Sequence, residues 1–351
     1  RDVLQSRGLG DVYKRQASNG VVFAASSQGI AEWDGATWSF VTGVASPNGG
    51  ALPLSMIEVG GVVYAAFEGV GILRYDTTTG GALSSWSSAN NLHSDTITHM
   101  ATSGNQLLLG SPDNGLGRFD HVAGFWLSTW NSGNWLASDT IAGLARVGPT
   151  LFVLNGDSLH TYNTTNGVFS TTYDLATLGL TNDGASLLHW PASGGASPAA
   201  EALMVDDGSG NLIHLSPNQL PFVEGNLLLA SAPTTNDMTA LVELDNVLYV
   251  GTGDNSMELL RYDIGQSIWM APWTITDNVV DMVVGPSAQQ GTSSLFVAME
   301  GSPTVAEMNT GGNLVQTYDG TSGCYPSSTS ILDLAVDADN LVLSLESGVF
   351  V

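Results

Sequence analysis

A short sequence motif, called the phrase below, recurs along the chain at a nearly constant spacing. Each copy has an apolar run, a glycine turn and a segment that ends in an aromatic residue followed by Asp or Asn. Clear copies read GVVYAAFEGVGILRYD from Gly61, NQLLLGSPDNGLGRFD from Asn105 and NVLYVGTGDNSMELLRYD from Asn246. The aromatic position falls at Trp33, Tyr75, Phe119, Tyr162, His214, Tyr262 and Met308, in steps of 42 to 52 residues. Such a period indicates a repeat protein whose units stack on one another.

Four short strands are expected in each unit. The apolar runs are short or alternate with polar residues, they are bounded by Gly, Asn, Asp or Ser, and none has a helical period. The fourth strand tends to carry an aromatic residue, at Trp38, Trp86, Trp130, Tyr173, Trp273 and Tyr318. Four antiparallel strands in each repeat predict an all-β protein, a β-propeller of four-stranded blades. Closure of the ring would remove the exposed sheet edges.

Six blades can be traced in full, at residues 52–92, 93–137, 138–180, 181–231, 232–275 and 276–325. C-terminal strands joined to the N-terminal strands would complete one more, so seven blades are predicted, with eight as the alternative. Residues 1–16 differ abruptly in charge from the rest and are similar to translated adapter sequence. We interpret them as a non-native or disordered leader. Residues 17–351 are then a single propeller domain, truncated at both ends, from a metagenomic fragment of a larger chain.

The charge balance is strongly acidic. The chain has 8 Lys and Arg against 33 Asp and Glu, for a net charge of −25. Such a surface repels nucleic acid and anionic membranes, so neither is expected as a partner. No apolar run is long enough to predict direct membrane insertion in this segment. The absence of Lys after residue 16 predicts a salt-adapted protein of a marine or halophilic prokaryote, which should lose stability below about 0.1 M salt.

The phrase at Leu248–Asp263, LYVGTGDNSMELLRYD, resembles the two-component-regulator type (YXXD-like) of propeller repeat. The resemblance covers essentially residues 17–351, although His214 and Met308 replace the aromatic residue in two copies. Members of that family form extracellular sensing domains of membrane-bound histidine kinases, and related repeats occur in secreted and cell-surface proteins. The resemblance therefore implies an extracellular or cell-surface binding module, a non-catalytic sensor of a protein or carbohydrate ligand.

Two repeated polar positions are expected to have structural roles. Arg74, Arg118 and Arg261 precede the aromatic residue, where a guanidinium group can pair with an acidic or carbonyl partner in the same or the adjacent blade. Anion recognition is the alternative. Asp76, Asp120 and Asp263 follow the aromatic residue, where a short acceptor side chain can cap the turn between the third and fourth strands.

The first strand of each blade should line an axial tunnel. The residue before its apolar position is polar in five copies: Ser55, His99, His189, Asp281 and Asp333. Imidazole and carboxylate groups at one level of a tunnel are candidate ligands for a divalent cation. Polar residues that only line a wet channel are the alternative.

Two other segments place oxygen ligands at alternate positions of glycine-permissive loops. These candidates for Ca²⁺ are Asp206, Asp207 and Asn211 in one segment, and Asp337 and Asp339 in the other. Neither has the spacing of an EF-hand, and turn chemistry explains both.

No nucleophile, phosphate-binding or metalloprotease motif is present. Two further functions stay open. A secreted enzyme acting on polysaccharide, of glycosidase or lyase type, would use a carboxylate pair beside Trp platforms. A structural spacer or adhesin would need no small ligand.

Overall fold

The structure is a computed structural model. It describes residues 13–16, 21–26, 28–33, 38–43, 51–178, 180, 184, 186–190, 202–206, 212–215, 238–253, 257–263, 266, 268–287, 292–300, 304–319, 331–337, 340–345 and 348–350. The chain divides into two compact units. One contains residues 11–177 and 182–187, and the other contains residues 1–10, 178–181 and 188–351.

The unit of residues 11–177 contains four sheets, each of four antiparallel strands. The strands are β1 (Tyr13–Gln16), β2 (Val22–Ser26), β3 (Gly29–Trp33) and β4 (Trp38–Phe40); β5 (Pro53–Val59), β6 (Val62–Phe67), β7 (Gly71–Asp76) and β8 (Gly81–Trp86); β9 (His99–Ser103), β10 (Gln106–Gly110), β11 (Leu116–Asp120) and β12 (Phe125–Trp130); β13 (Gly143–Val147), β14 (Thr150–Asn155), β15 (Ser158–Asn163) and β16 (Val168–Asp174). Two short helices, η1 (Ser88–Asn90) and α1 (Leu175–Leu178), follow β8 and β16.

The other unit has two four-stranded and two three-stranded sheets. They are β17 (Ser186–Trp190), β18 (Ala202–Asp206) and β19 (Leu212–Leu215); β20 (Met238–Leu244), β21 (Val247–Thr252), β22 (Glu258–Asp263) and β23 (Ile268–Thr274); β24 (Val279–Pro286), β25 (Ser293–Met299), β26 (Thr304–Met308) and β27 (Leu314–Asp319); β28 (Ile331–Asp337), β29 (Asn340–Leu345) and β30 (Gly348–Phe350).

The prediction of an all-β protein built from propeller blades is confirmed, but the predicted number of blades is wrong. Six sheets are four-stranded blades, in place of seven or of the alternative eight. The two remaining sheets have three strands each. Among the described residues, Tyr13–Gln16 pairs with β2 as the first strand of a four-stranded sheet, so β2–β4 need no C-terminal strand to complete their blade. That strand lies within the segment that the sequence analysis had set aside.

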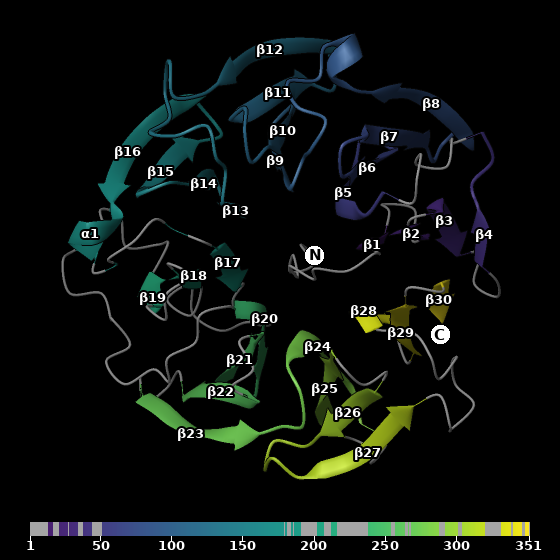
Figure 1. Cartoon of the computed structure of the whole chain (residues 1–351), viewed down its shortest axis with the longest axis vertical. Coiled ribbons are helices and arrows are strands. Elements are labelled where there is room, and N and C mark those ends of the chain that lie inside the picture. Colours follow the sequence, from purple (N-terminus) through teal and green to yellow (C-terminus); the bar gives the residue numbers. More distant parts are fainter. Residues whose placement is uncertain are drawn as a thin grey trace. The chain divides into compact units, whose positions relative to one another are not determined.

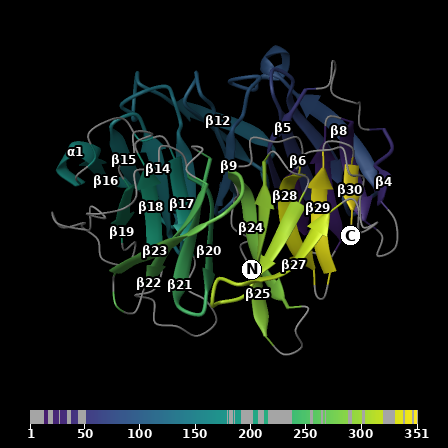
Figure 2. The same cartoon turned by 60° about the horizontal axis from the view of Figure 1, so that its bottom comes forward.

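Each sheet follows the simplest antiparallel order, with every strand beside its neighbour in sequence (Figure 1). The first strands of successive sheets contact one another: β1 with β5, β5 with β9 and β9 with β13 in one unit, and β20 with β24 and β24 with β28 in the other. Figure 2 shows β24 and β28 side by side. The first strand of a blade is therefore the inner strand, and the fourth strand is the outer one.

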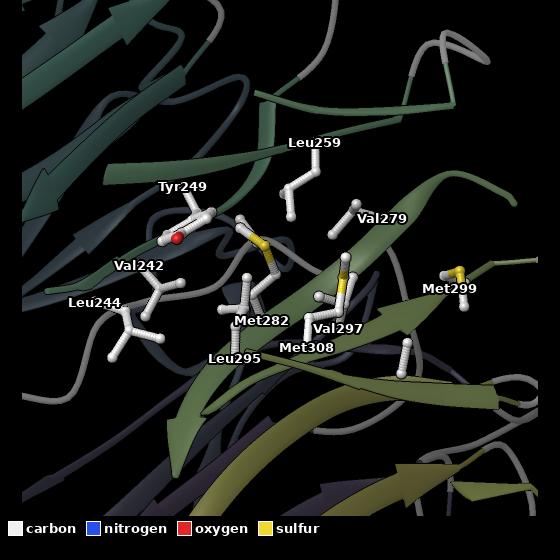
Figure 3. Close-up of a cluster of buried hydrophobic side chains, with 12 residues drawn as sticks. Val242, Leu244, Tyr249, Leu259, Val279, Met282, Leu295, Val297, Met299 and Met308 are labelled. Atoms are coloured by element: carbon white, nitrogen blue, oxygen red, sulfur yellow. The ribbon is translucent and has the colours of Figure 1, made fainter. Parts of the chain in front are cut away.

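Apolar side chains fill the space between successive sheets. Between β20–β23 and β24–β27, Tyr249 and Leu259 of one sheet pack with Met282, Leu295 and Val297 of the next (Figure 3). All five side chains are buried. Because a middle strand has a sheet neighbour on each side, its apolar runs are nearly continuous rather than strictly alternating. No helix of the described residues is long and apolar enough to cross a membrane.

Candidate ligand-binding site

The three repeated arginines bind carbonyl groups of their own blades. In each of these blades the register of the third and fourth strands shifts at the arginine, as in a β-bulge. A bulge leaves a residue outside the regular ladder, so its carbonyl group is open to another donor. The arginine Nε atom donates to that strand, to Ser84 O at 2.8 Å from Arg74, to Ser128 O at 2.9 Å from Arg118 and to Ala271 O at 3.0 Å from Arg261.

Each of these guanidinium groups also lies over an indole ring. The distances from the guanidinium carbon to the ring centre are 4.2 Å for Arg74 and Trp86, 4.1 Å for Arg118 and Trp130, and 4.4 Å for Arg261 and Trp273. Burial lowers the pKa of all three arginines, and the nearby phenols of Tyr64, Tyr162 and Tyr249 partly offset that effect. The hydrogen bond and the cation–π contact give the repeated arginine a structural role within its blade.

The repeated aromatic residue packs on the tryptophan of the preceding blade. Trp86 contacts Phe119 of the next blade at 4.5 Å between ring centres, and Trp130 contacts Tyr162 at 4.8 Å. We name the boundary between β5–β8 and β9–β12 the first seam, and the boundary between β9–β12 and β13–β16 the second seam. The phrase of the sequence therefore recurs because each blade supplies one half of a seam.

Replacing Arg118 with methionine is expected to lower the free energy of unfolding by about 1–2 kcal/mol, because two hydrogen bonds to Ser128 and a cation–π contact are lost while the apolar stem stays. The control is Arg146→Met, since Arg146 is exposed and its Nε atom donates at 3.1 Å to Gly148 O within the same hairpin. That change should cost less than about 0.5 kcal/mol. Denaturant unfolding of both variants measures the difference, and equal losses would contradict the assigned role.

The repeated Asp caps the turn between the third and fourth strands. Asp76 Oδ1 accepts hydrogen bonds from the backbone N–H groups of Thr78 and Thr79 at 2.8 and 3.1 Å. Asp120 Oδ1 accepts equivalent bonds from residues 122 and 123, and Asp263 Oδ1 accepts one from residue 266. These bonds lower the pKa of Asp76. The side chains of this position therefore bind their own backbone.

Three of the five predicted tunnel residues have described side chains, and all three are buried: Ser55, His99 and Asp281. Asp281 Oδ2 accepts a hydrogen bond at 2.7 Å from the N–H group of Leu334 on the next inner strand, β28. The register shift just before Asp281 is a β-bulge, which re-aims the following side chain toward the neighbouring sheet. His99 Nδ1 lies 2.9 Å from the hydroxyl of Thr98.

Among the described residues, no three His, Cys, Asp or Glu side chains come together as a metal site. His189 lies in β17 and Asp333 in β28, but their side chains are outside the described residues. The same holds for the side chains of the predicted calcium loops, Asp206, Asp207, Asn211, Asp337 and Asp339. A cation at either place stays a prediction.

The loops that follow β8 and β12 share a pattern that the sequence analysis missed. Trp86–Ile97 reads WSSANNLHSDTI, and Trp130–Ile141 reads WNSGNWLASDTI. The same hydrogen bonds fold both: Asp95 Oδ1 accepts from Ser88 N at 2.6 Å, and Asp139 Oδ1 accepts from Ser132 N at 2.8 Å. The shared pattern W-x-S-x-N-x-L-x-S-D-T-I indicates in the sequence itself that the two loops are related.

At one of the positions where the two loops differ, a polar residue is exchanged for a large aromatic one. Asn91 of the first loop corresponds to Trp135 of the second, and both residues are exposed. Trp135 is 61% exposed and stacks on Phe169 of the next blade, with 5.7 Å between ring centres and 21° between the planes. An Asn occupies the corresponding place in the related loop, with a φ of +78° that Trp135 does not share, so that loop folds without an indole there.

The other tryptophans of this stretch have structural roles. Trp130 is buried, and Trp126 packs at 4.9 Å against Trp86 in the first seam. Trp135 and Phe169 together form what we name the aromatic platform. One face of the Trp135 ring is covered by Phe169, and most of its remaining surface is open to a ligand.

Several solved structures share this fold. The computationally designed Ika8 protein is 16% identical, with a TM-score of 0.63 and coverage of 98% of both chains. Sqt1 of Saccharomyces cerevisiae is 13% identical, with a TM-score of 0.69 over 99% of this chain and 98% of that chain. No family model and no curated protein sequence matches the chain. The fold is therefore that of a β-propeller.

A third similar structure is the extracellular domain of BT4673 from B. thetaiotaomicron, which is named a one-component system. It is 17% identical, with a TM-score of 0.53, and the match covers 99% of this chain and 39% of that one. A second structure of that domain, named part of a hybrid two-component system, is 16% identical with a TM-score of 0.52. At these identities the similarity concerns the fold.

Proposed function

We propose that the protein is an extracellular or cell-surface module that binds a ligand without catalysis, and that the ligand stacks on the aromatic platform. The observation that carries the proposal is Trp135, a large exposed indole at a position where the equivalent loop has Asn91. Tryptophan side chains at binding surfaces often supply much of the binding energy of a complex. The propeller repeat of two-component-regulator type, which the sequence resembles, supports a sensing role.

A neutral carbohydrate fits this platform better than an anionic ligand. The net charge of −25 disfavours anionic ligands, including nucleic acids that would stack on an aromatic ring. An indole has a flat apolar face and a polar N–H group, which match the apolar faces and hydroxyl groups of pyranose rings. Polar residues surround Trp135 in its loop, at Asn131, Ser132 and Asn134. A protein ligand is the second kind of partner that the test can find.

Affinity electrophoresis tests the proposal. The protein is run in native gels that contain a neutral β-glucan, mannan, xylan or starch, beside gels without polysaccharide. We expect at least one polysaccharide to retard the wild-type protein and to leave Trp135→Asn unretarded, because this change restores the residue of the equivalent loop. Phe125→Asn is the matched control, since Phe125 is 52% exposed at the start of an outer strand. It should run like the wild type.

Equal retardation of both variants would place the ligand elsewhere on the protein. Release of new reducing ends during incubation would favour a polysaccharide-degrading enzyme instead. If none of the four polysaccharides retards the protein, protein ligands are tested next with the same two variants.

A further inference from the structure

A half-buried histidine, His93, lies in the first seam, and a buried one, His160, lies in the second. His93 comes from the loop after β8, and Gly117 on β11 leaves room for it, because a Cβ atom at Gly117 would lie 2.3 Å from His93 Nδ1. In the second seam the large and the small side chain are exchanged between the loop and the third strand. His160 on β15 takes the place that corresponds to Gly117, and Ala137 takes the loop position of His93. Each seam thus holds one imidazole, supplied from opposite sides.

Both imidazoles have few hydrogen-bond partners. Among the described residues, neither ring nitrogen of His93 has a hydrogen bond of normal geometry, and Nε2 of His160 has none either. Nδ1 of His160 lies 2.9 Å from the hydroxyl of Thr172, and its ring packs edge-on against Phe169 with 6.1 Å between ring centres. His160 is only 3% exposed. A protonated His160 would carry a buried Nε2–H group without an acceptor among the described residues, and a protonated His93 would place its charge on two buried ring nitrogens without a hydrogen bond of normal geometry.

The charged groups of the two seams offset this cost only in part. In the first seam, burial lowers the pKa of His93 to about 4, against the opposing effects of the Asp113 carboxylate and of the Gly115 and Leu109 backbones. In the second seam, burial lowers the pKa of His160, against the Asp157 carboxylate. Arg74 and Arg118 lie in these seams over their tryptophans.

We propose that His93 and His160 form an acid-responsive element, in which protonation of either imidazole loosens its seam and frees the adjoining loop. The loops concerned are the two related ones, residues 87–97 and 131–141. The proposal concerns the stability of the seams and does not depend on the identity of a ligand. Histidine is suited to such a role because its ordinary pKa places the change of charge in the mildly acidic range.

The sign of the effect follows from the lowered pKa values. The unfolded state takes up a proton near pH 6.5, but the folded state resists it, so stability is lost as the pH falls from about 6.5 toward 4. For His93 alone, the unfolding equilibrium constant should rise about 30-fold between pH 7.5 and pH 5. The protonation of His160 should add to that rise.

Denaturant unfolding at fixed ionic strength between pH 7.5 and pH 5 tests the element in the full chain. The variants are His93→Ala, which installs the residue of the equivalent loop, and His160→Asn, which keeps a polar group near Thr172. Each variant should show a smaller rise of the unfolding constant than the wild type, by about 30-fold for His93→Ala. The same rise in wild type and folded variants would overturn the proposal.

Imidazole NMR resonances of the wild-type protein provide a test that needs no variant. While the protein is folded, we expect the His93 imidazole to titrate near pH 4 and the His160 imidazole to titrate below its ordinary pKa. If the resonances of His93 and His160, assigned through the variants or by backbone correlation, titrate near pH 6.5, the proposal is wrong.

Discussion

Replacing Gly115 with alanine is expected to lower the free energy of unfolding by about 3 kcal/mol or more. Gly115 has a φ of +78°, and a Cβ atom there would lie 2.2 Å from the carbonyl oxygen of Trp130. That oxygen belongs to the backbone and cannot move without displacing the end of β12. The Gly115 N–H group also donates to Asp139 O at 2.7 Å, which holds the following loop.

Gly124→Ala is the matched control for this prediction. Gly124 has a φ of +77°, almost the same as Gly115, but no atom lies within 4 Å of the position of an added Cβ atom. The control should therefore cost only the backbone strain of an L-residue in this conformation, about 1–2 kcal/mol. Thermal and denaturant unfolding measure both variants. Equal losses would show that the close approach to Trp130 O does not exist.

Trp130→Ala should be the most damaging substitution in the second seam. The Trp130 ring lies 4.5 Å from Phe169 and 4.8 Å from Tyr162 between ring centres, and the Arg118 guanidinium lies 4.1 Å above it. Removing a buried tryptophan costs about 3–5 kcal/mol through lost burial and the cavity that remains. Unfolding in denaturant should show a loss of that size.

Trp135→Ala provides the comparison, because the same type of side chain is removed five residues later in the same loop. Trp135 is 61% exposed, so its removal should cost less than about 1 kcal/mol. If the two variants lost the same stability, the assignment of Trp130 to the seam and of Trp135 to the ligand would be untenable.

The repeat explains why much of the fold could be predicted. The aromatic residue, the arginine before it and the Asp after it recur because each seam and each turn needs the same contacts, as Arg118 and Asp120 show. The number of blades could not be predicted in the same way. It depends on which strands pair at the ends of the chain, and Tyr13–Gln16 forms a strand from residues that do not match the repeat.

The candidate site was only partly visible in the sequence. The predicted tunnel residues lie on first strands of their sheets, but the bulge before Asp281 directs its carboxylate to the backbone of the next sheet. Period-2 alternation cannot anticipate a bulge, since one extra residue exchanges the two faces of a strand. Trp126, Trp130 and Trp135 looked alike in the sequence. The alignment of Trp135 with Asn91 distinguishes it from the other two.

The central claim is that Trp135 is the ligand-binding residue of the aromatic platform and has no role in the folding of its loop. Isothermal titration calorimetry with an oligosaccharide of the polysaccharide that retards the wild type measures this directly, on wild type, Trp135→Asn and Phe125→Asn. We expect the dissociation constant to rise at least 30-fold for Trp135→Asn, as for a hot-spot residue worth about 2 kcal/mol, and to stay within about 2-fold of the wild type for Phe125→Asn. Unchanged affinity in a stably folded Trp135→Asn variant would contradict the account.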